Sequence, residues 1–162
     1  MITAFKGDLT KLNNVDYIVN CANAKGFMSS GIAGAIKLQG GVEIQDSALL
    51  ICSKHNYEPG DIYLTHAGRL SFKNVVHLIT MKNPGGTTSY EIVEKCLQNL
   101  INYCRVSKIK KSALPALGTG VGGLNIIKIA EIFKEILEPV EDIEFLIVDI
   151  DPLFIYYLNR QE

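Results

Sequence analysis

The sequence predicts an α/β fold, in which helices cover both faces of a mixed or mostly parallel sheet. Two observations lead to this fold class. Short runs rich in β-branched residues alternate with longer amphipathic segments, and glycine-containing loops join some of these runs to the segments that follow. The chain has 162 residues, of which 48% are hydrophobic and 20% charged, a composition typical of one globular domain. We therefore expect a single domain over residues 1–162.

Six short runs have the length and composition of strands. Most are apolar or rich in β-branched residues, and polar or glycine-bearing segments follow several of them. The expected strands are residues 2–6, 15–19, 62–66, 74–80, 112–116 and 144–149.

Five segments are expected to be helices. Residues 91–104 carry an apolar stripe at i, i+4 and i+8 spacing, and Thr88 with Glu91 forms the pattern of a capping box at its start. Asn125 is the expected cap of the next helix. Two glycines separate helices at residues 31–39 and 42–55, and Pro152 suits the first turn of a last helix.

Composition narrows the classes of partner and site. The formal net charge is −1, so no basic excess favours binding along a nucleic-acid backbone. The chain shows no signal peptide and no run of about 20 apolar residues. The four cysteines form no C-x-x-C pair and no spacing typical of a zinc site; they are Cys21, Cys52, Cys96 and Cys104. We therefore expect reduced thiols, of which Cys96 and Cys104 are buried. We expect no metal and no cofactor. These features favour a cytoplasmic protein that does not associate with membranes.

Two loops have the composition of anion-binding turns. Residues 20–36 follow an apolar strand and open a helix, where main-chain N–H groups carry partial positive charge. A purely structural turn explains this loop equally well. Residues 114–125 contain glycine at four of six successive positions, 118 to 123, and this costs conformational entropy that a main-chain anion nest would justify. If both loops follow strand carboxyl ends, together they can hold two adjacent phosphates.

Four segments together resemble the signatures of the macro domain family, and they occur in the family's order. These are residues 7–10 (GDLT), 18–23 (IVNCAN), 31–36 (GIAGAI) and 115–120 (PALGTG). The resemblance covers nearly the whole chain. It implies a three-layer α/β/α fold around a mixed sheet of about six strands, and binding of ADP-ribose.

The resemblance also implies individual roles. Asp8 matches the aspartate that accepts a hydrogen bond from the adenine amino group, and the main chain of Leu9 is expected near the ring. Without the resemblance, an exposed turn or capping aspartate is the preferred interpretation of Asp8. Asn23 matches the asparagine that orients the distal ribose, which makes it the candidate catalytic residue; a loop asparagine bonded to its own backbone is the alternative. The full set of expected ligand-binding residues is Asp8, Leu9, Asn20, Ser29, Ser30, Gly31, Ile32, Ala33, Gly118, Thr119, Gly120, Val121, Gly122 and Ile150, among which Asn20 is more typical of a structural residue.

The chain departs from the family's pattern at several of these positions. Ser29 and Ser30 stand where two of three successive glycines are usual, and their hydroxyls can donate to phosphate. The catalytic aspartate of one hydrolase branch falls at Ala33 or Gly34. Ile150 takes the place of an aromatic residue that stacks on adenine.

A second hydrolase branch uses a lysine nucleophile, which Lys82 only faintly echoes. That branch has an assisting aspartate in the second loop, and here the position is Gly122. An aromatic residue that often faces the distal ribose also falls at Gly122. The lysine mechanism is therefore unsupported by this sequence.

Two functions remain open at this point. The first is hydrolysis of an ADP-ribose linkage in a modified protein or nucleic acid, in O-acetyl-ADP-ribose or in ADP-ribose 1″-phosphate. The second is a reader that binds ADP-ribose without turnover. A P-loop nucleotide binder is discounted, because no G-x-x-x-x-G-K-[ST] motif is present. We expect a monomer, and we expect His77, which lies within an apolar strand, to be a core histidine.

Overall fold

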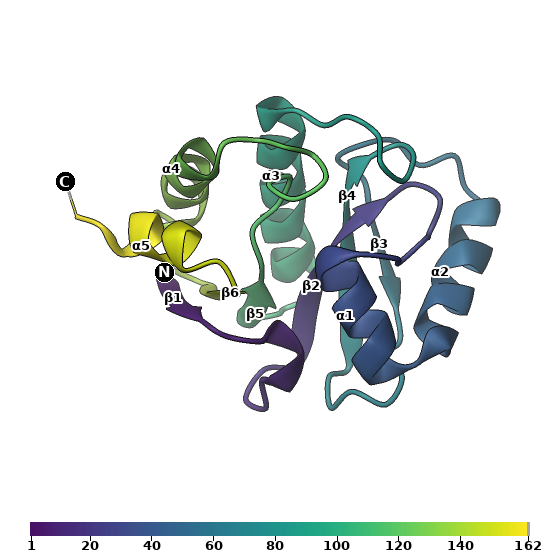
Figure 1. The fold of residues 1–162 in the computed structure, drawn as a ribbon. Helices are drawn as coiled ribbons and strands as arrows, with labels where there is room; N and C mark the ends of the chain where they lie inside the picture. The colour runs from purple at the N-terminus through teal and green to yellow at the C-terminus, as the bar shows by residue number, and fades with distance from the viewer. Residues whose placement is uncertain (162) are drawn as a thin grey trace.

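The computed structural model describes residues 1–161, and they form three layers around a central sheet (Figure 1). The strands lie in the order β1 (Ile2–Lys6), β6 (Glu144–Asp149), β5 (Lys111–Leu114), β2 (Tyr17–Asn23), β4 (Asn74–Met81) and β3 (Ile62–Thr65). Only β3 is antiparallel to its neighbour within this described sheet. The α/β class and the mixed sheet of about six strands are therefore confirmed.

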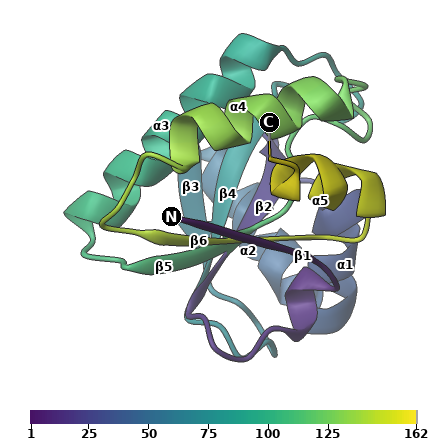
Figure 2. The same ribbon diagram turned by 90° about the vertical axis from the view of Figure 1, so that its left-hand side faces the viewer.

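Helices cover both faces of the sheet (Figure 2). One face carries α1 (Gly31–Gly40) and α2 (Val42–Ser53), and the other carries α3 (Tyr90–Val106), α4 (Ile126–Leu137) and α5 (Pro152–Asn159). A short 3-10 helix, η1 (Leu9–Lys11), follows β1. None of the helices in the described part of the chain is both long and apolar enough to cross a bilayer.

The sheet separates two hydrophobic clusters. Alternate residues of a strand point to opposite faces, so Val19 of β2 packs with α3 and α4 while the adjacent Ile18 packs with α1 and α2. In the cluster that contains Val19, Phe133 of α4 and Phe154 of α5 are fully buried. Their rings meet edge to face, with centroids 5.3 Å apart. Burial of both faces explains why the central strands read as continuous apolar runs.

Except at the end of β2, the element boundaries lie within two residues of the expected ranges, and one expected helix cap is replaced by another. The second strand continues to Asn23 instead of ending at residue 19, because β2 lies between β4 and β5 and its polar end still pairs with β4. The capping box at Thr88 and Glu91 is wrong: the N-cap is Ser89, whose Oγ accepts the N–H of Ile92 at 3.2 Å, and α3 begins at Tyr90. The caps at Asn125 and the first-turn Pro152 are confirmed.

Asn20 belongs to a buried polar chain that crosses three strands. Its Nδ2 donates to Nδ1 of His77 at 3.0 Å, and Nε2 of His77 lies 2.9 Å from Oγ1 of Thr65. Because Nδ1 of His77 accepts, Nε2 carries the proton and donates to Thr65, whose hydroxyl donates to the carbonyl of His66 at 2.9 Å. The His77 ring also stacks on Tyr63 at 4.4 Å. His77 is thus the satisfied core histidine that the sequence predicted.

Burial lowers the pKa of His77 to about 3, which gives stability a specific pH dependence. The unfolded chain takes up a proton on this ring near its ordinary pKa of 6.5, whereas the folded chain does not. Stability is therefore lost as the pH falls below 6.5, by about 1.4 kcal/mol per pH unit. We predict that the stability advantage of the native protein over His77→Gln shrinks by about 2 kcal/mol between pH 6.5 and pH 5, measured by urea unfolding. A constant difference over that range would show that His77 titrates normally in the folded state.

Candidate functional site

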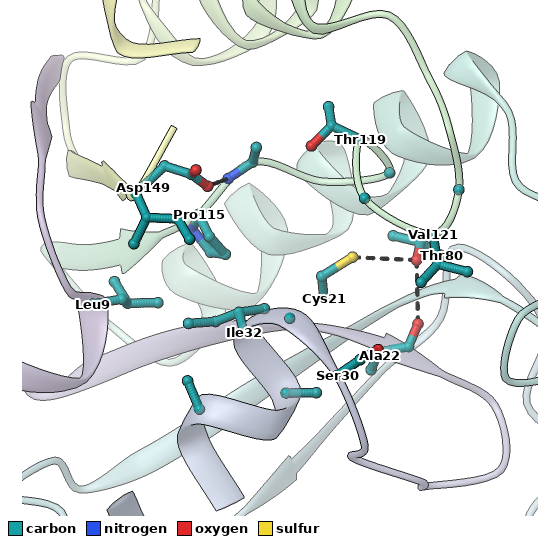
Figure 3. A pocket seen from close by; sticks show the side chains of 18 of the residues that line it. Leu9, Cys21, Ala22, Ser30, Ile32, Thr80, Pro115, Thr119, Val121 and Asp149 are labelled. Atoms are coloured by element: carbon teal, nitrogen blue, oxygen red, sulfur yellow. Dashed lines mark hydrogen bonds between the residues drawn. The ribbon is translucent and has the colours of Figure 1, made fainter. Parts of the chain in front are cut away.

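A cavity of about 580 Å³ lies at the carboxyl ends of five parallel strands (Figure 3). Strands β1, β6, β5, β2 and β4 all end at this edge of the sheet, where ligands of open α/β sheets bind. Four strand spacings of about 4.8 Å make the row of ends about 19 Å long. Apart from Asn20, which is buried in the polar chain described above, every residue expected at the site from the sequence lines this cavity.

At the β1 end of the cavity, Asp8 presents one fixed and one open carboxylate oxygen. Its Oδ1 accepts the N–H of Thr10 at 3.0 Å and the hydroxyl of Thr10 at 2.6 Å. Its Oδ2 is 4.0 Å from Nζ of Lys11, an exposed pair that contributes little energy. One oxygen therefore orients the carboxylate, and the other is available to a donor on a ligand.

Asp149, which the sequence analysis did not select, ties the neighbouring strand ends together. Its Oδ2 accepts the N–H of Ala116 at 2.9 Å and its Oδ1 accepts the N–H of Asp151 at 2.9 Å. The carboxylate thus joins the end of β6 to the loop after β5 and to the start of α5 (Figure 3). Its only signal in the sequence is an acidic residue that ends an apolar strand two positions before another aspartate.

The first turn of α1 leaves its N–H groups available to the cavity. Ser30 is the N-cap residue, with extended backbone angles, but its hydroxyl makes no capping bond. Only from Gly34 onward does a helical N–H find its carbonyl partner, that of Ser30, at 3.0 Å. Within the described chain, the preceding three N–H groups therefore have no protein acceptor. This geometry suits an anion, because the helix dipole adds to the open donors.

The loop between β5 and α4 curls around the same cavity. Gly118 has φ +75°, which a side chain would strain, and its carbonyl accepts the N–H of Leu124 at 2.9 Å. A Cβ at Gly122 would lie 2.6 Å from Cγ2 of Thr88 and 2.7 Å from the carbonyl oxygen of Gly118. An aspartate or an aromatic ring at position 122 would therefore need the main chain to move. The departure from the family's pattern at this position has a steric cause.

Asn23 organises the loop that follows β2. Its Oδ1 accepts the N–H groups of Lys25 and Gly26, each at 3.0 Å, and its Nδ2 donates to the carbonyl of Phe27 at 2.9 Å. Asn23 lines the cavity and retains one free Nδ2 hydrogen. The alternative of a loop asparagine bonded to its own backbone is therefore confirmed, and the ligand-orienting role of Asn23 stays a prediction that the second Nδ2 hydrogen leaves open.

Cys21 is a second lining residue that the sequence analysis did not select. Its Sγ is 3.4 Å from Oγ1 of Thr80, and this hydroxyl donates to the carbonyl of Ala22 at 3.2 Å (Figure 3). The thiol is therefore the donor to Thr80. Burial raises the pKa of Cys21, so the group is a neutral thiol and not a nucleophilic thiolate at neutral pH.

The charged side chains that line the cavity are all acidic. They are Asp8, Asp149 and Asp151, and no lysine, arginine or histidine of residues 1–161 lines it. Lys82 is directed elsewhere, with its Nζ 2.7 Å from the carbonyl of Tyr57 and 2.9 Å from Oε1 of Glu58. An anion in this cavity would be bound by main-chain N–H groups, not by a cation. No cluster of three metal-ligating side chains occurs among the residues that the structure describes.

Sequence and structure comparisons agree on one family. A macro domain model matches residues 19–133. An uncharacterised protein of Aquifex aeolicus is 39% identical over 123 residues, which cover 76% of this chain and 72% of that protein. A protein of Salmonella newport named O-acetyl-ADP-ribose deacetylase is 33% identical over 133 residues, which cover 81% of this chain and 74% of that protein.

Solved structures show the same fold. The macrodomain of Oceanobacillus iheyensis with ADPR superposes with a TM-score of 0.85 at 20% identity, covering 97% of this chain and 89% of that one. The macrodomain of Thermus aquaticus DarG gives a TM-score of 0.80 at 26% identity, covering 91% and 97%. The order of strands, the cavity at their carboxyl ends and these matches lead to one conclusion: the chain belongs to the macro domain family.

Proposed function

We propose that the protein binds ADP-ribose along the row of strand ends, with adenine at Asp8 and the distal ribose at Asn23. The observation that carries this proposal is the sequence of groups along the cavity. An open carboxylate oxygen follows β1 at one end, the glycine loop follows β5, and Asn23 ends β2, whose loop leads to the open N–H groups of α1. These groups suit an amino-substituted base, a diphosphate and a sugar. The solved macrodomain of Oceanobacillus iheyensis carries ADPR in the same fold.

The base is recognised by one hydrogen bond and by apolar contact. Oδ2 of Asp8 accepts a proton from the adenine amino group, while Oδ1 remains fixed by Thr10. Ile150 is 78% exposed and Leu9 is buried, and both line the cavity. A bound adenine covers part of the Ile150 side chain, which gives apolar burial without a stacked ring.

The diphosphate is held without a cation. The open N–H groups at the start of α1 take one phosphate, and the main chain around Gly120 takes the other. A Cβ at Gly120 would meet nothing within 4 Å, so the main chain there is open to the ligand. Hydrogen bonds from N–H groups to a charged phosphate are stronger than those to a neutral acceptor.

The proposed reaction is hydrolysis of an ester on the distal ribose, as the name of the Salmonella relative suggests. Position 33 is an alanine, Lys82 is bound outside the cavity and Cys21 is protonated, so none of them supplies a base or nucleophile. The resemblance to macro domains that lack a loop carboxylate implies that a water attacks, activated by the substrate's own phosphate and held between the two loops. Catalysis then comes from positioning and electrostatic stabilisation.

A reader function is the second candidate. The same lack of a basic or nucleophilic side chain near Ala33 favours it, because binding needs only the N–H groups and Asp8. The two candidates predict the same affinity for ADP-ribose and differ only in turnover.

The first experiment tests binding and turnover together. ADP-ribose should raise the melting temperature, and AMP should raise it less because AMP leaves the second phosphate site and the ribose site empty. Turnover is tested with three substrates: O-acetyl-ADP-ribose, an ADP-ribosylated protein and an ADP-ribosylated nucleic acid. We expect release of ADP-ribose from O-acetyl-ADP-ribose. Binding without release from any substrate would establish the reader, and no binding at millimolar ADP-ribose would refute both.

Asp8→Asn tests recognition of the base. The asparagine oxygen can keep the bonds to Thr10, while its amide nitrogen replaces the open oxygen and faces the adenine amino group donor to donor. We predict a loss of about 1.5–3 kcal/mol in ADP-ribose affinity by calorimetry. The matched control is the analogue of ADP-ribose that carries hypoxanthine in place of adenine. Its base oxygen can accept a hydrogen bond from the new amide, so its affinity should fall much less. Equal losses for both ligands would remove Asp8 from base recognition.

Asn23→Ala tests positioning of the ribose. We predict that the rate of ester hydrolysis falls about 10²-fold while ADP-ribose affinity falls less than tenfold, because misplacement of the ribose affects the transition state most. Single-turnover rates and equilibrium binding measure the two effects separately. Lys25→Ala is the control, since this exposed loop residue contributes only its main chain to Asn23. Parallel losses of rate and affinity would show that Asn23 only supports the loop.

A further inference from the structure

We propose that the cavity continues past the distal ribose into an acyl subsite, which prefers ester groups longer than acetyl and rejects a phosphate at that position. This inference rests on the proposed function, because it assigns the group that the distal ribose carries. The subsite is defined by Phe27, Met81, Pro84 and Val121.

The subsite lies on the far side of Asn23 from the adenine end. Met81 is the strand partner of Asn23, and its carbonyl accepts the N–H of Ala24 at 3.0 Å. The cavity extends from there to Pro84, in the loop after β4. Figure 3 shows Val121 above Thr80, at the opposite end from Leu9 and Asp149. A substituent of a ribose held by Asn23 therefore meets these side chains before it reaches solvent.

The lining of the subsite is apolar and incompletely covered by the protein. Phe27 is 49% exposed and Val121 is 63% exposed, although both line the cavity. They come from two separate loops, after β2 and after β5, and both line the cavity. An alkyl chain between them would remove apolar surface from water on both sides, which an acetyl group is too short to do.

The same lining disfavours a charged substituent. No cationic side chain of the described residues lines the cavity, and the N–H groups of both loops are already assigned to the diphosphate. A third phosphate at the distal ribose would lose part of its hydration against apolar side chains and gain no counter-charge. A neutral ester carries no such cost.

Chain length does not change the reaction. The oxygen of water adds to the acyl carbon, the bond from that carbon to the ribose oxygen breaks, and a proton from the water passes to the ribose oxygen, which becomes a hydroxyl. The products are ADP-ribose and the free carboxylic acid, which ionises at neutral pH. A carboxylate is less stable than a neutral ester in an apolar subsite, so the ionised product leaves the subsite more readily than the substrate.

The test compares O-acetyl-, O-propionyl- and O-butyryl-ADP-ribose with ADP-ribose 1″-phosphate, using the intact protein. Complete burial of one methylene group corresponds to about a fourfold change in an equilibrium constant. The butyryl ester has two more methylene groups than the acetyl ester, so their partial burial should raise kcat/KM by about threefold or more. Release of phosphate should be at least tenfold less efficient than release of acetate. If the protein hydrolyses no ester, affinities of the intact esters are measured instead and should rise in the same order.

Variants assign the preference to these side chains. Phe27→Ala and Val121→Ala should bring the butyryl-to-acetyl ratio close to one, and Phe27→Leu should restore most of it. The matched control is Leu50→Ala, which removes an exposed apolar side chain of α2 outside the cavity lining and should leave the ratio unchanged.

The outcomes separate this inference from the proposed function. Normal ADP-ribose binding with no increase from acetyl to butyryl, or with efficient release of phosphate, would overturn the acyl subsite alone. A ratio that survives in both alanine variants would also overturn it. Failure to bind ADP-ribose or any ester would overturn the two proposals together.

Discussion

Parallel alignment of five strands is the constraint on which the cavity depends. Because β1, β6, β5, β2 and β4 run in the same direction, five loops distant in sequence emerge along one edge of the sheet. The carboxylate of Asp149 then fixes the spacing of this edge, since it bonds the main chain of two neighbouring connections. The position of Asp8 relative to Asn23 is thus set by the sheet and not by either loop alone.

The second constraint is electrostatic. A cavity whose lining charges are all acidic repels a diphosphate unless main-chain N–H groups are left without protein partners. The first turn of α1 leaves such groups open, because the hydroxyl of Ser30 makes no capping bond; α2 also lacks a side-chain cap, but its first turn does not line the cavity. Uncapped donors destabilise the free protein slightly, and a bound anion would recover that energy.

Local patterns predicted the fold class, the helices and the two glycine-containing loops, whereas the individual cavity residues came from the resemblance to the macro domain family. Helical periodicity identified α3 to within two residues, and Asn125 marked the start of α4. The failures concern the cap of α3, the end of β2 and contacts between strands. Ending β2 at residue 19 placed Asn20 in a loop, whereas the longer strand puts Asn20 on the face of Ile18 and Ala22, toward His77. Asp149 was missed because its partners are main-chain groups 33 and two residues away.

Asn23 shows why local support and chemistry need not compete for one residue. Its oxygen is fully used by two N–H groups of its own loop, and one of its two amide hydrogens is used by Phe27. These bonds fix the plane of the amide, so the remaining hydrogen has a defined direction instead of rotating freely. The same bond from Asn23 also fixes the main chain of Phe27, whose ring lines the far end of the cavity. If Asn23 orients the ribose as proposed, this role and the shape of the adjoining end of the cavity depend on a single side chain.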